Sequence, residues 1–160
     1  MRLILEGPDC AGKSTMAKEL AERLKLDIIK STYYGPKTSD AYRDRLACQD
    51  VVIDRCWISE VIYSKYFGCT PIVDDFTDRM LCDICVKQNI PIIVMLPPID
   101  VIIQRMMERG DDFYSVVAPN VHAIYKDYED YCAARPFIHV FMDYNPSKMV
   151  DFLIKNALEG

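Results

Sequence analysis

Residues 7–14 carry the pattern with the most direct chemical meaning in this chain. They read Gly-Pro-Asp-Cys-Ala-Gly-Lys-Ser, which matches G-x-x-x-x-G-K-[ST], a loop that binds the phosphates of nucleoside triphosphates. The apolar run 3–5 precedes this loop, and apolar residues recur at helical spacing from Met16 to Leu24. We therefore expect a buried strand, a glycine-rich loop and a helix, in that order.

This arrangement is suited to anion binding. Backbone N–H groups at a helix start, together with the positive end of the helix dipole, attract phosphate. Lys13 can reach the outer phosphates, and the Ser14 hydroxyl can bind Mg²⁺. The loop predicts ATP as a ligand, with Gly7, Asp9, Cys10, Ala11, Gly12, Lys13, Ser14 and Thr15 as the binding residues.

A second candidate group is Asp54-Arg55, which follows the apolar run 51–53. A buried strand of this kind delivers a carboxylate to its tip, where Asp54 could coordinate Mg²⁺ beside the phosphate loop. Arg55 offers a planar fork suited to a substrate phosphate. The same pair could simply end a strand at the surface, but a phosphate loop in the same chain favours the binding site.

Arg105 and Arg109 form a third group. They are four residues apart and so share one face of a helix, which Gly110 is expected to end. We expect a lid at about 105–116 that closes over the triphosphate, where arginine charge can contribute about 10³-fold or more to phosphoryl transfer. The alternative is a solvated helix in which Glu108 pairs with an arginine.

Additional substrate contacts are expected from two helices. Glu60 and Tyr63 share a helix face after Arg55 and could touch a sugar or base, although aromatic residues at helical spacing more often pack in the core. Arg45 is a further candidate for the acceptor phosphate. The turn at 143–146, after the last expected strand, is placed at the edge of the same crevice, where it could border the nucleotide base.

Apolar runs and helical patterns alternate along the chain, which predicts an α/β fold: a five-stranded parallel sheet with helices on both faces, in three layers. The expected strands are 2–5, 27–30, 51–54, 91–96 and 137–143. The expected helices are 13–25, 39–48, 57–67, 75–89, 99–109, 116–134 and 146–158. We expect residues 1–160 to form a single domain.

Composition excludes several classes of function. The net charge of −5 and the lack of a long basic run argue against a polynucleotide partner. No apolar run approaches the ~20 residues of a membrane span, and the N-terminus enters a strand at once, which predicts no signal peptide. Seven scattered cysteines are an odd number, better explained by free thiols in a reducing cytoplasm than by disulfides or a metal site.

Three segments together resemble the thymidylate kinase family. Residues 6–15 resemble its phosphate loop, 54–63 its Asp-Arg motif ending in a tyrosine, and 105–112 its arginine-bearing lid, in the family's order. The resemblance implies the P-loop NTPase fold. It also implies transfer of the γ-phosphoryl group of ATP to a deoxynucleoside 5′-monophosphate, with Mg²⁺.

The resemblance also implies roles for individual residues. Asp9 would contact the sugar hydroxyl of the substrate, Arg55 the acceptor phosphate, and Tyr63 would lie near the sugar. Lys13 and Ser14 would hold ATP and Mg²⁺, with Asp54 near the metal. Some family members carry a catalytic arginine within the loop; here that position is Cys10, so Arg105 or Arg109 would supply the charge.

Other functions remain open at this level. In a deoxynucleoside kinase the acceptor would be an uncharged nucleoside, and Glu6 or Asp54 would accept its 5′-hydroxyl proton. A non-catalytic nucleotide switch is less favoured because no Asn/Thr-Lys-x-Asp guanine motif is present. A polynucleotide kinase would need a basic groove. The expected partner is a small nucleotide, with a homodimer as an open alternative to a monomer.

Overall fold

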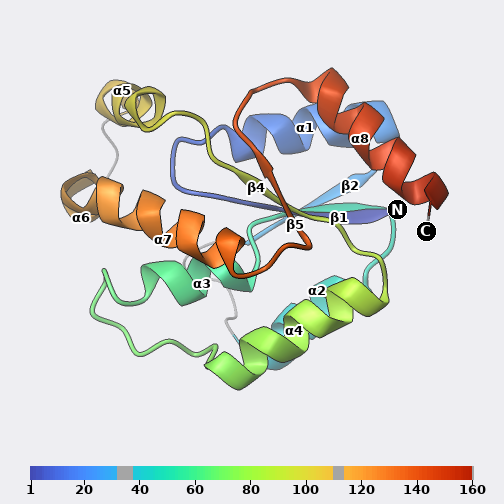
Figure 1. Ribbon diagram of the computed structural model, residues 1–160, viewed down its shortest axis with the longest axis horizontal. Coiled ribbons are helices and arrows are strands. Elements are labelled where there is room, and N and C mark those ends of the chain that lie inside the picture. Colours follow the sequence, from blue (N-terminus) through green and yellow to red (C-terminus); the bar gives the residue numbers. More distant parts are fainter. Residues whose placement is uncertain (32–37, 110–113, 160) are drawn as a thin grey trace.

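The computed structural model describes residues 1–31, 38–109 and 114–159 (Figure 1). At its centre lies a five-stranded parallel sheet in the order β2-β3-β1-β4-β5. Its strands are β1 (Arg2–Glu6), β2 (Asp27–Lys30), β3 (Val51–Asp54), β4 (Ile92–Met95) and β5 (Ile138–Phe141). The register sets Lys30 of β2 and Leu5 of β1 on either side of Asp54 of β3. The carboxyl ends of these three strands therefore meet at one edge, as expected.

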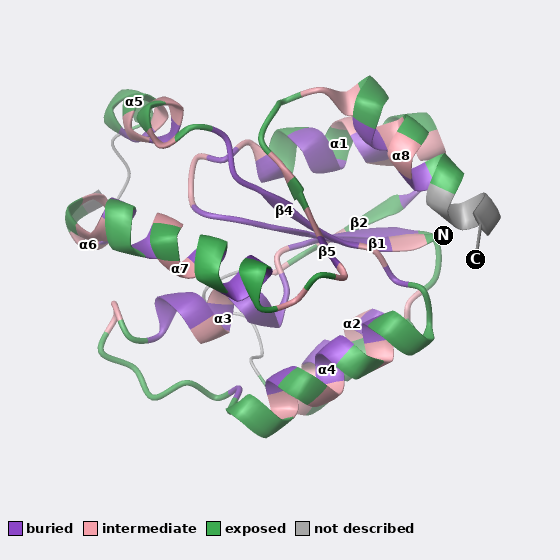
Figure 2. Cartoon of the chain, viewed as in Figure 1, coloured by how far each residue is buried: buried purple, intermediate pink, exposed green. Residues whose placement is uncertain are grey.

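Helices cover both faces of the sheet (Figure 1). One face is covered by α1 (Lys13–Leu24) and α8 (Pro146–Glu159). The other is covered by α2 (Ser39–Ala47), α3 (Trp57–Tyr63), α4 (Asp75–Lys87) and α7 (Val121–Ala133). Because strand side chains alternate between faces, Leu3 and Leu5 join one core and Ile4 the other, all fully buried (Figure 2). The expected three-layer α/β fold is confirmed.

The largest departure from the expected elements lies at 116–134. This stretch is not one helix but α6 (Tyr114–Val117), a 3₁₀ turn (Ala118–Asn120) and then α7. Pro119 explains the division, because proline lacks the N–H that a continuous helix requires. The preceding helix, α5 (Ile99–Arg109), has the expected bounds. Within the described residues, no helix is long and apolar enough to cross a membrane.

A buried carboxylate of α4 forms hydrogen bonds with two neighbouring helices, α3 and α7. Asp78 of α4 is only 4% exposed and accepts hydrogen bonds from Trp57 of α3 (2.7 Å) and Tyr131 of α7. Arg135, just after α7, forms an ion pair with the same carboxylate. The charge is thus compensated by one cation and two neutral donors, which a buried carboxylate requires. Asp78 therefore links α4 to α3 and to α7.

We expect Asp78→Asn to lower the free energy of unfolding by about 2–3 kcal/mol, because a nearly isosteric amide removes the ion pair and one acceptor site. Denaturant titration of the purified chain measures this loss. Asp44→Asn, a change at an exposed position of α2, serves as the matched control and should alter stability by less than about 0.5 kcal/mol. Equal stabilities of the two variants would contradict the assignment.

Candidate active site

The two motif glycines adopt conformations that other residues rarely take. Gly7 has φ +136°, and a Cβ there would lie 2.4 Å from the backbone oxygen of Met95 on β4. Gly12 has φ +91° and immediately precedes α1. The loop must therefore pass close to β4 and then turn sharply into the helix, which only glycine permits at these points.

The loop and the strand tips enclose a cavity of about 570 Å³. Residues from all three predicted groups line it: the phosphate loop, the Asp-Arg strand tip and the arginines of α5. The predicted residues brought together are Asp9, Cys10, Gly12, Lys13, Ser14, Thr15, Arg55, Arg105 and Arg109. Such a convergence of polar groups in one cavity is typical of a binding site.

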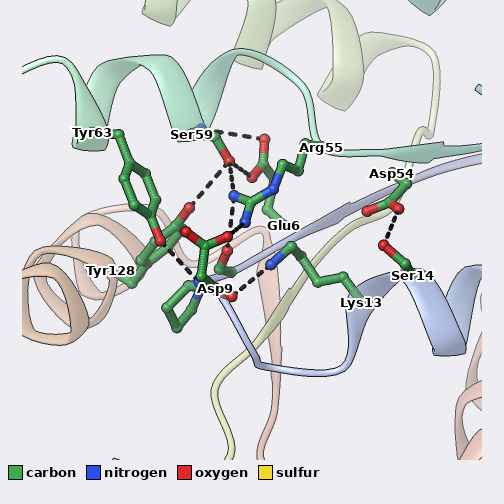
Figure 3. Close-up of polar contacts among 11 residues, drawn as sticks. Glu6, Asp9, Lys13, Ser14, Asp54, Arg55, Ser59, Tyr63 and Tyr128 are labelled. Atoms are coloured by element: carbon green, nitrogen blue, oxygen red, sulfur yellow. Dashed lines mark hydrogen bonds and ion pairs between the residues drawn. The ribbon is translucent and has the colours of Figure 1, made fainter. Parts of the chain in front are cut away.

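Lys13 is buried in the first turn of α1. Its side chain is 5% exposed in the fold, and its Nζ donates to the backbone oxygen of Pro8 at 2.5 Å (Figure 3). Burial, reinforced by the positive charge of Arg55, lowers the pKa of Lys13 to about 7. The amine is therefore close to half-protonated at neutral pH and would gain charge stabilisation from a phosphate in the cavity.

Ser14 and Asp54 form a pair of oxygen ligands beside Lys13. The Ser14 hydroxyl donates to a carboxylate oxygen of Asp54 at 2.6 Å, and Asp54 is 2% exposed (Figure 3). These are the hard oxygen donors that Mg²⁺ prefers. Among the described residues, no group of three or more acidic, His or Cys side chains could hold a metal alone. The pair therefore fits a Mg²⁺ ion that takes its remaining ligands from phosphate and water.

Arg55 points from the tip of β3 into the cavity. Its φ is +69°, a left-handed conformation that is strained for a residue with a side chain and is often found at functional sites. One guanidinium nitrogen donates to the Ser59 hydroxyl at 2.9 Å, and another forms an ion pair with Asp9 (Figure 3). Burial alone would lower the pKa of Arg55, but the charge of Asp9, together with Tyr63, Tyr128 and Glu6, outweighs burial and raises that pKa.

Asp9 is held by the same cluster. Burial would raise the pKa of its carboxyl, but the positive charges of Arg55, Lys13 and Arg109 outweigh this and lower it. Its backbone N–H donates to the Tyr63 hydroxyl at 2.9 Å, so α3 fixes the position of the loop. The Tyr63 ring also lies against Arg55, 5.6 Å from the guanidinium carbon to the ring centroid.

Glu6 acts on Arg55 indirectly, because it holds the Ser59 hydroxyl to which Arg55 donates. It is fully buried at the end of β1, and its oxygens accept from the backbone N–H of Cys56 (2.6 Å) and the Ser59 hydroxyl (2.6 Å), with the Ser59 N–H at 3.3 Å (Figure 3). It thereby satisfies N–H groups at the start of α3, as a helix cap does. Tyr128 of α7 completes the group with its hydroxyl 3.2 Å from that of Ser59. Glu6 does not line the cavity.

The arginines of α5 approach the loop from the other side. Arg105 donates to the backbone oxygen of Cys10 at 3.1 Å, and Arg109 lines the cavity from an exposed position. The predicted lid at 105–116 falls partly outside the described residues, which omit 110–113.

Three predicted substrate residues do not line this cavity: Tyr63, whose hydroxyl accepts from the loop N–H of Asp9, and also Glu60 and Arg45. Glu60 is buried on α3, and Arg45 lies half-buried on α2. Both face Tyr42, whose pKa is raised by burial and by the charge of Glu60, with Arg45 opposing. Their contact with a substrate stays a prediction.

Two cavity residues were not among the predicted set: Lys30 and Tyr144. Lys30 ends β2 beside Asp54, and the rule that parallel strand ends share one edge could have identified it. Tyr144 lies in the 143–146 turn that was placed at the crevice edge. It reaches the loop itself, since a Cβ on Gly12 would lie 3.5 Å from the Tyr144 ring.

Comparison with known proteins places the chain in a family. No protein-family model matches it. Over 117 residues it is 33% identical to the SPbeta prophage-derived uncharacterized protein YorR of Bacillus subtilis (strain 168), covering 69% of this chain and 70% of that protein. The chain belongs to the YorR family.

Solved structures support the fold of this YorR family member. The crystal structure of Bacillus subtilis YorR in complex with phosphorylated GDP superimposes with a TM-score of 0.82 at 24% identity, covering 100% of this chain and 99% of that one. Deoxyadenosine kinase from M. mycoides with bound dATP gives 0.61 at 17% identity over the full length of both chains. Shikimate kinase from Acinetobacter baumannii in complex with shikimate gives 0.62 at 15% identity, covering 97% and 93%.

These likenesses show that the chain shares the α/β fold of P-loop kinases, which is the fold that its motifs predict. They do not single out thymidylate kinases, so the narrower resemblance remains a proposal for this YorR family member.

Proposed function

We propose that this protein is an ATP-dependent kinase that phosphorylates a deoxynucleoside 5′-monophosphate, acting as a single domain. The observation that carries the proposal is the charge of the cavity. Its lining contains five basic side chains against one acidic side chain, Asp9, in a chain whose net charge is −5. The basic residues are Lys13, Lys30, Arg55, Arg105 and Arg109.

This charge suits two phosphorylated ligands better than one. A phosphate monoester carries about −1.5 to −2 at neutral pH, and it adds to the charge of the triphosphate. An uncharged nucleoside acceptor would leave Arg55 with Asp9 as its anionic partner and with no phosphate to bind. The guanine nucleotide bound by YorR, described as phosphorylated GDP, supports a nucleotide as occupant and adds guanine to the bases that need testing.

Each group then has a role. The loop N–H groups, with Lys13, hold the ATP phosphates, and Mg²⁺ held by Ser14 and Asp54 would neutralise developing phosphate charge. Arg55 binds the acceptor phosphate in line with the γ-phosphate, and Asp9 receives the sugar hydroxyl. Cys10 supplies no cation, so the guanidinium groups of α5 stabilise charge on the transferring group.

The lowered pKa of Lys13 predicts proton uptake on ATP binding. Without bound phosphate, the pKa of Lys13 is lowered to about 7. Bound phosphate favours the charged amine and raises its pKa, so above pH 7 each binding event must take up a proton. ATP affinity should therefore be nearly constant below pH 7 and fall by up to about tenfold per pH unit above it.

Calorimetric titration at pH 8.5 in two buffers of different ionisation enthalpy measures this uptake. We expect close to one proton per ATP for the wild type. Lys13→Arg, which stays charged, should bind ATP without this uptake. Equal enthalpies in both buffers for the wild type would rule out the titration of Lys13.

The proposed activity is tested by ADP release in the presence of ATP and Mg²⁺. The panel contains dTMP, dGMP, dCMP and dAMP, the corresponding nucleosides, and DNA with free 5′ ends. We expect turnover with at least one monophosphate and none with its nucleoside. Turnover with a nucleoside but with no monophosphate would show that the protein is a deoxynucleoside kinase and would contradict the proposal. Slow ATP hydrolysis that does not depend on an acceptor would indicate a nucleotide switch.

A further inference from the structure

Helix α4 presents an exposed face on the side opposite to its core contacts. Phe76 is 76% exposed and Val86 50%, and Arg79 and Asp83 between them are also exposed (Figure 2). A single exposed apolar residue is ordinary on a protein surface. Here two large apolar residues flank a basic and an acidic residue along one helix, which is typical of an interaction surface.

The spacing of these four residues is that of a helix-pairing stripe. The positions 76, 79, 83 and 86 advance by three, four and three residues. This is the a–d–a–d order of a heptad, which places all four side chains on one side of a helix. The buried residues of α4, Leu81, Cys82 and Cys85 among them, occupy the other side. The stripe, defined as Phe76, Arg79, Asp83 and Val86, is therefore free of the core.

The stripe is complementary to itself when reversed. If a second copy of α4 runs antiparallel about a two-fold axis at Leu81, position 76 faces 86 and position 79 faces 83. Phe76 then packs on Val86 of the other copy, and Arg79 meets Asp83, twice each by symmetry. This reciprocal matching is the property of a two-fold interface. We propose that this chain forms a homodimer through antiparallel contact of its α4 stripes.

The charges of Arg79 and Asp83 favour a second copy of this chain as the partner, and they favour antiparallel pairing of the two helices. A parallel pairing would set Arg79 against Arg79 and Asp83 against Asp83, which is repulsive. Within residues 1–31, 38–109 and 114–159, neither Arg79 nor Asp83 forms an ion pair, so both charges are available to a partner. A second copy of this chain offers an opposite charge to each charged residue of the stripe and an apolar side chain to each apolar residue.

The extent of the stripe sets the expected affinity. Helix α4 has 13 residues and is about 20 Å long, so the pairing alone buries less than the ~800 Å² per partner of a standard interface. We expect a dissociation constant in the micromolar range, about 1–100 μM. No residue of α4 lines the cavity, so each copy retains its own nucleotide site.

Sedimentation equilibrium of the full chain between about 1 and 500 μM tests the proposal. The wild type should pass from monomer to dimer across this range. Arg79→Asp makes the stripe acidic, and Asp83→Arg makes it basic; each variant alone should weaken self-association at least tenfold. An equimolar mixture of the two should form a heterodimer, and the double variant Arg79→Asp/Asp83→Arg should dimerise again as the wild type does.

Phe76→Glu should also give a monomer, and Lys18→Glu, at an exposed position of α1, is the matched control that should leave the dimer intact. Circular dichroism and ATP binding check that each variant is folded. A wild type that stays monomeric at 500 μM overturns the proposal. So does a dimer that survives in both single charge variants, or a mixture in which no heterodimer forms.

Discussion

Replacing Lys13 by alanine is expected to lower the rate of ADP release by about 10²- to 10³-fold. Lys13 is the buried cation at the end of the loop, where α1 begins. It is 5% exposed, and its Nζ lies 2.5 Å from the Pro8 carbonyl oxygen, which it would exchange for a phosphate oxygen. Its loss removes a charge that acts on the transferring group in a water-poor site. The measurement is kcat with saturating ATP and acceptor.

Lys18→Ala provides the control for this result. Lys18 lies on the same helix, one and a half turns away, but is exposed and does not line the cavity. It should retain full activity. A Lys13→Ala variant that turns over within threefold of the Lys18→Ala variant would show that the loop does not hold the reacting phosphates.

The second large effect is expected at Arg55. Arg55→Ala should raise KM for the monophosphate by about 100-fold or more and KM for ATP by less than about threefold, because a bidentate arginine contact is lost from only one ligand. Asp9 also loses its ion-pair partner, so the pKa of its carboxyl should rise from its lowered value. Initial-rate kinetics with each substrate varied in turn separate the two KM values.

Arg23→Ala is the matched arginine control. Arg23 lies on the exposed side of α1, paired with Glu19, and should leave both KM values unchanged. Equal increases in the two KM values of Arg55→Ala would contradict the assignment of Arg55 to the acceptor site.

Much of the site could be predicted from sequence because its parts are local. The phosphate loop is a continuous motif in which glycine spacing dictates the backbone, and Gly7 and Gly12 occupy the strained positions that the motif implies. Asp54 ends a wholly buried strand and Arg55 follows it, and the carboxyl ends of parallel strands meet at one edge of a sheet. These two facts suffice to bring the loop and the strand tip together.

The remaining site residues depend on strand order and helix rotation, which no local pattern encodes. Lys30 reaches the cavity because β2 is the neighbour of β3. Glu60 does not line the cavity and its charge acts on Tyr42 of α2, whereas Tyr63 of the same helix accepts from the loop N–H of Asp9. Glu6 looked like a candidate base, yet in the fold it caps α3 through Cys56 and Ser59.

The measurement that tests the account most directly follows the label of [γ-³²P]ATP in the presence of Mg²⁺ and each deoxynucleoside monophosphate. We predict that the label appears in the β-phosphate of the nucleoside diphosphate for at least one base, and that Lys13→Ala slows this transfer by about 10²- to 10³-fold. Label found only in inorganic phosphate, or on the 5′-hydroxyl of a nucleoside and on no monophosphate, would contradict the proposed reaction.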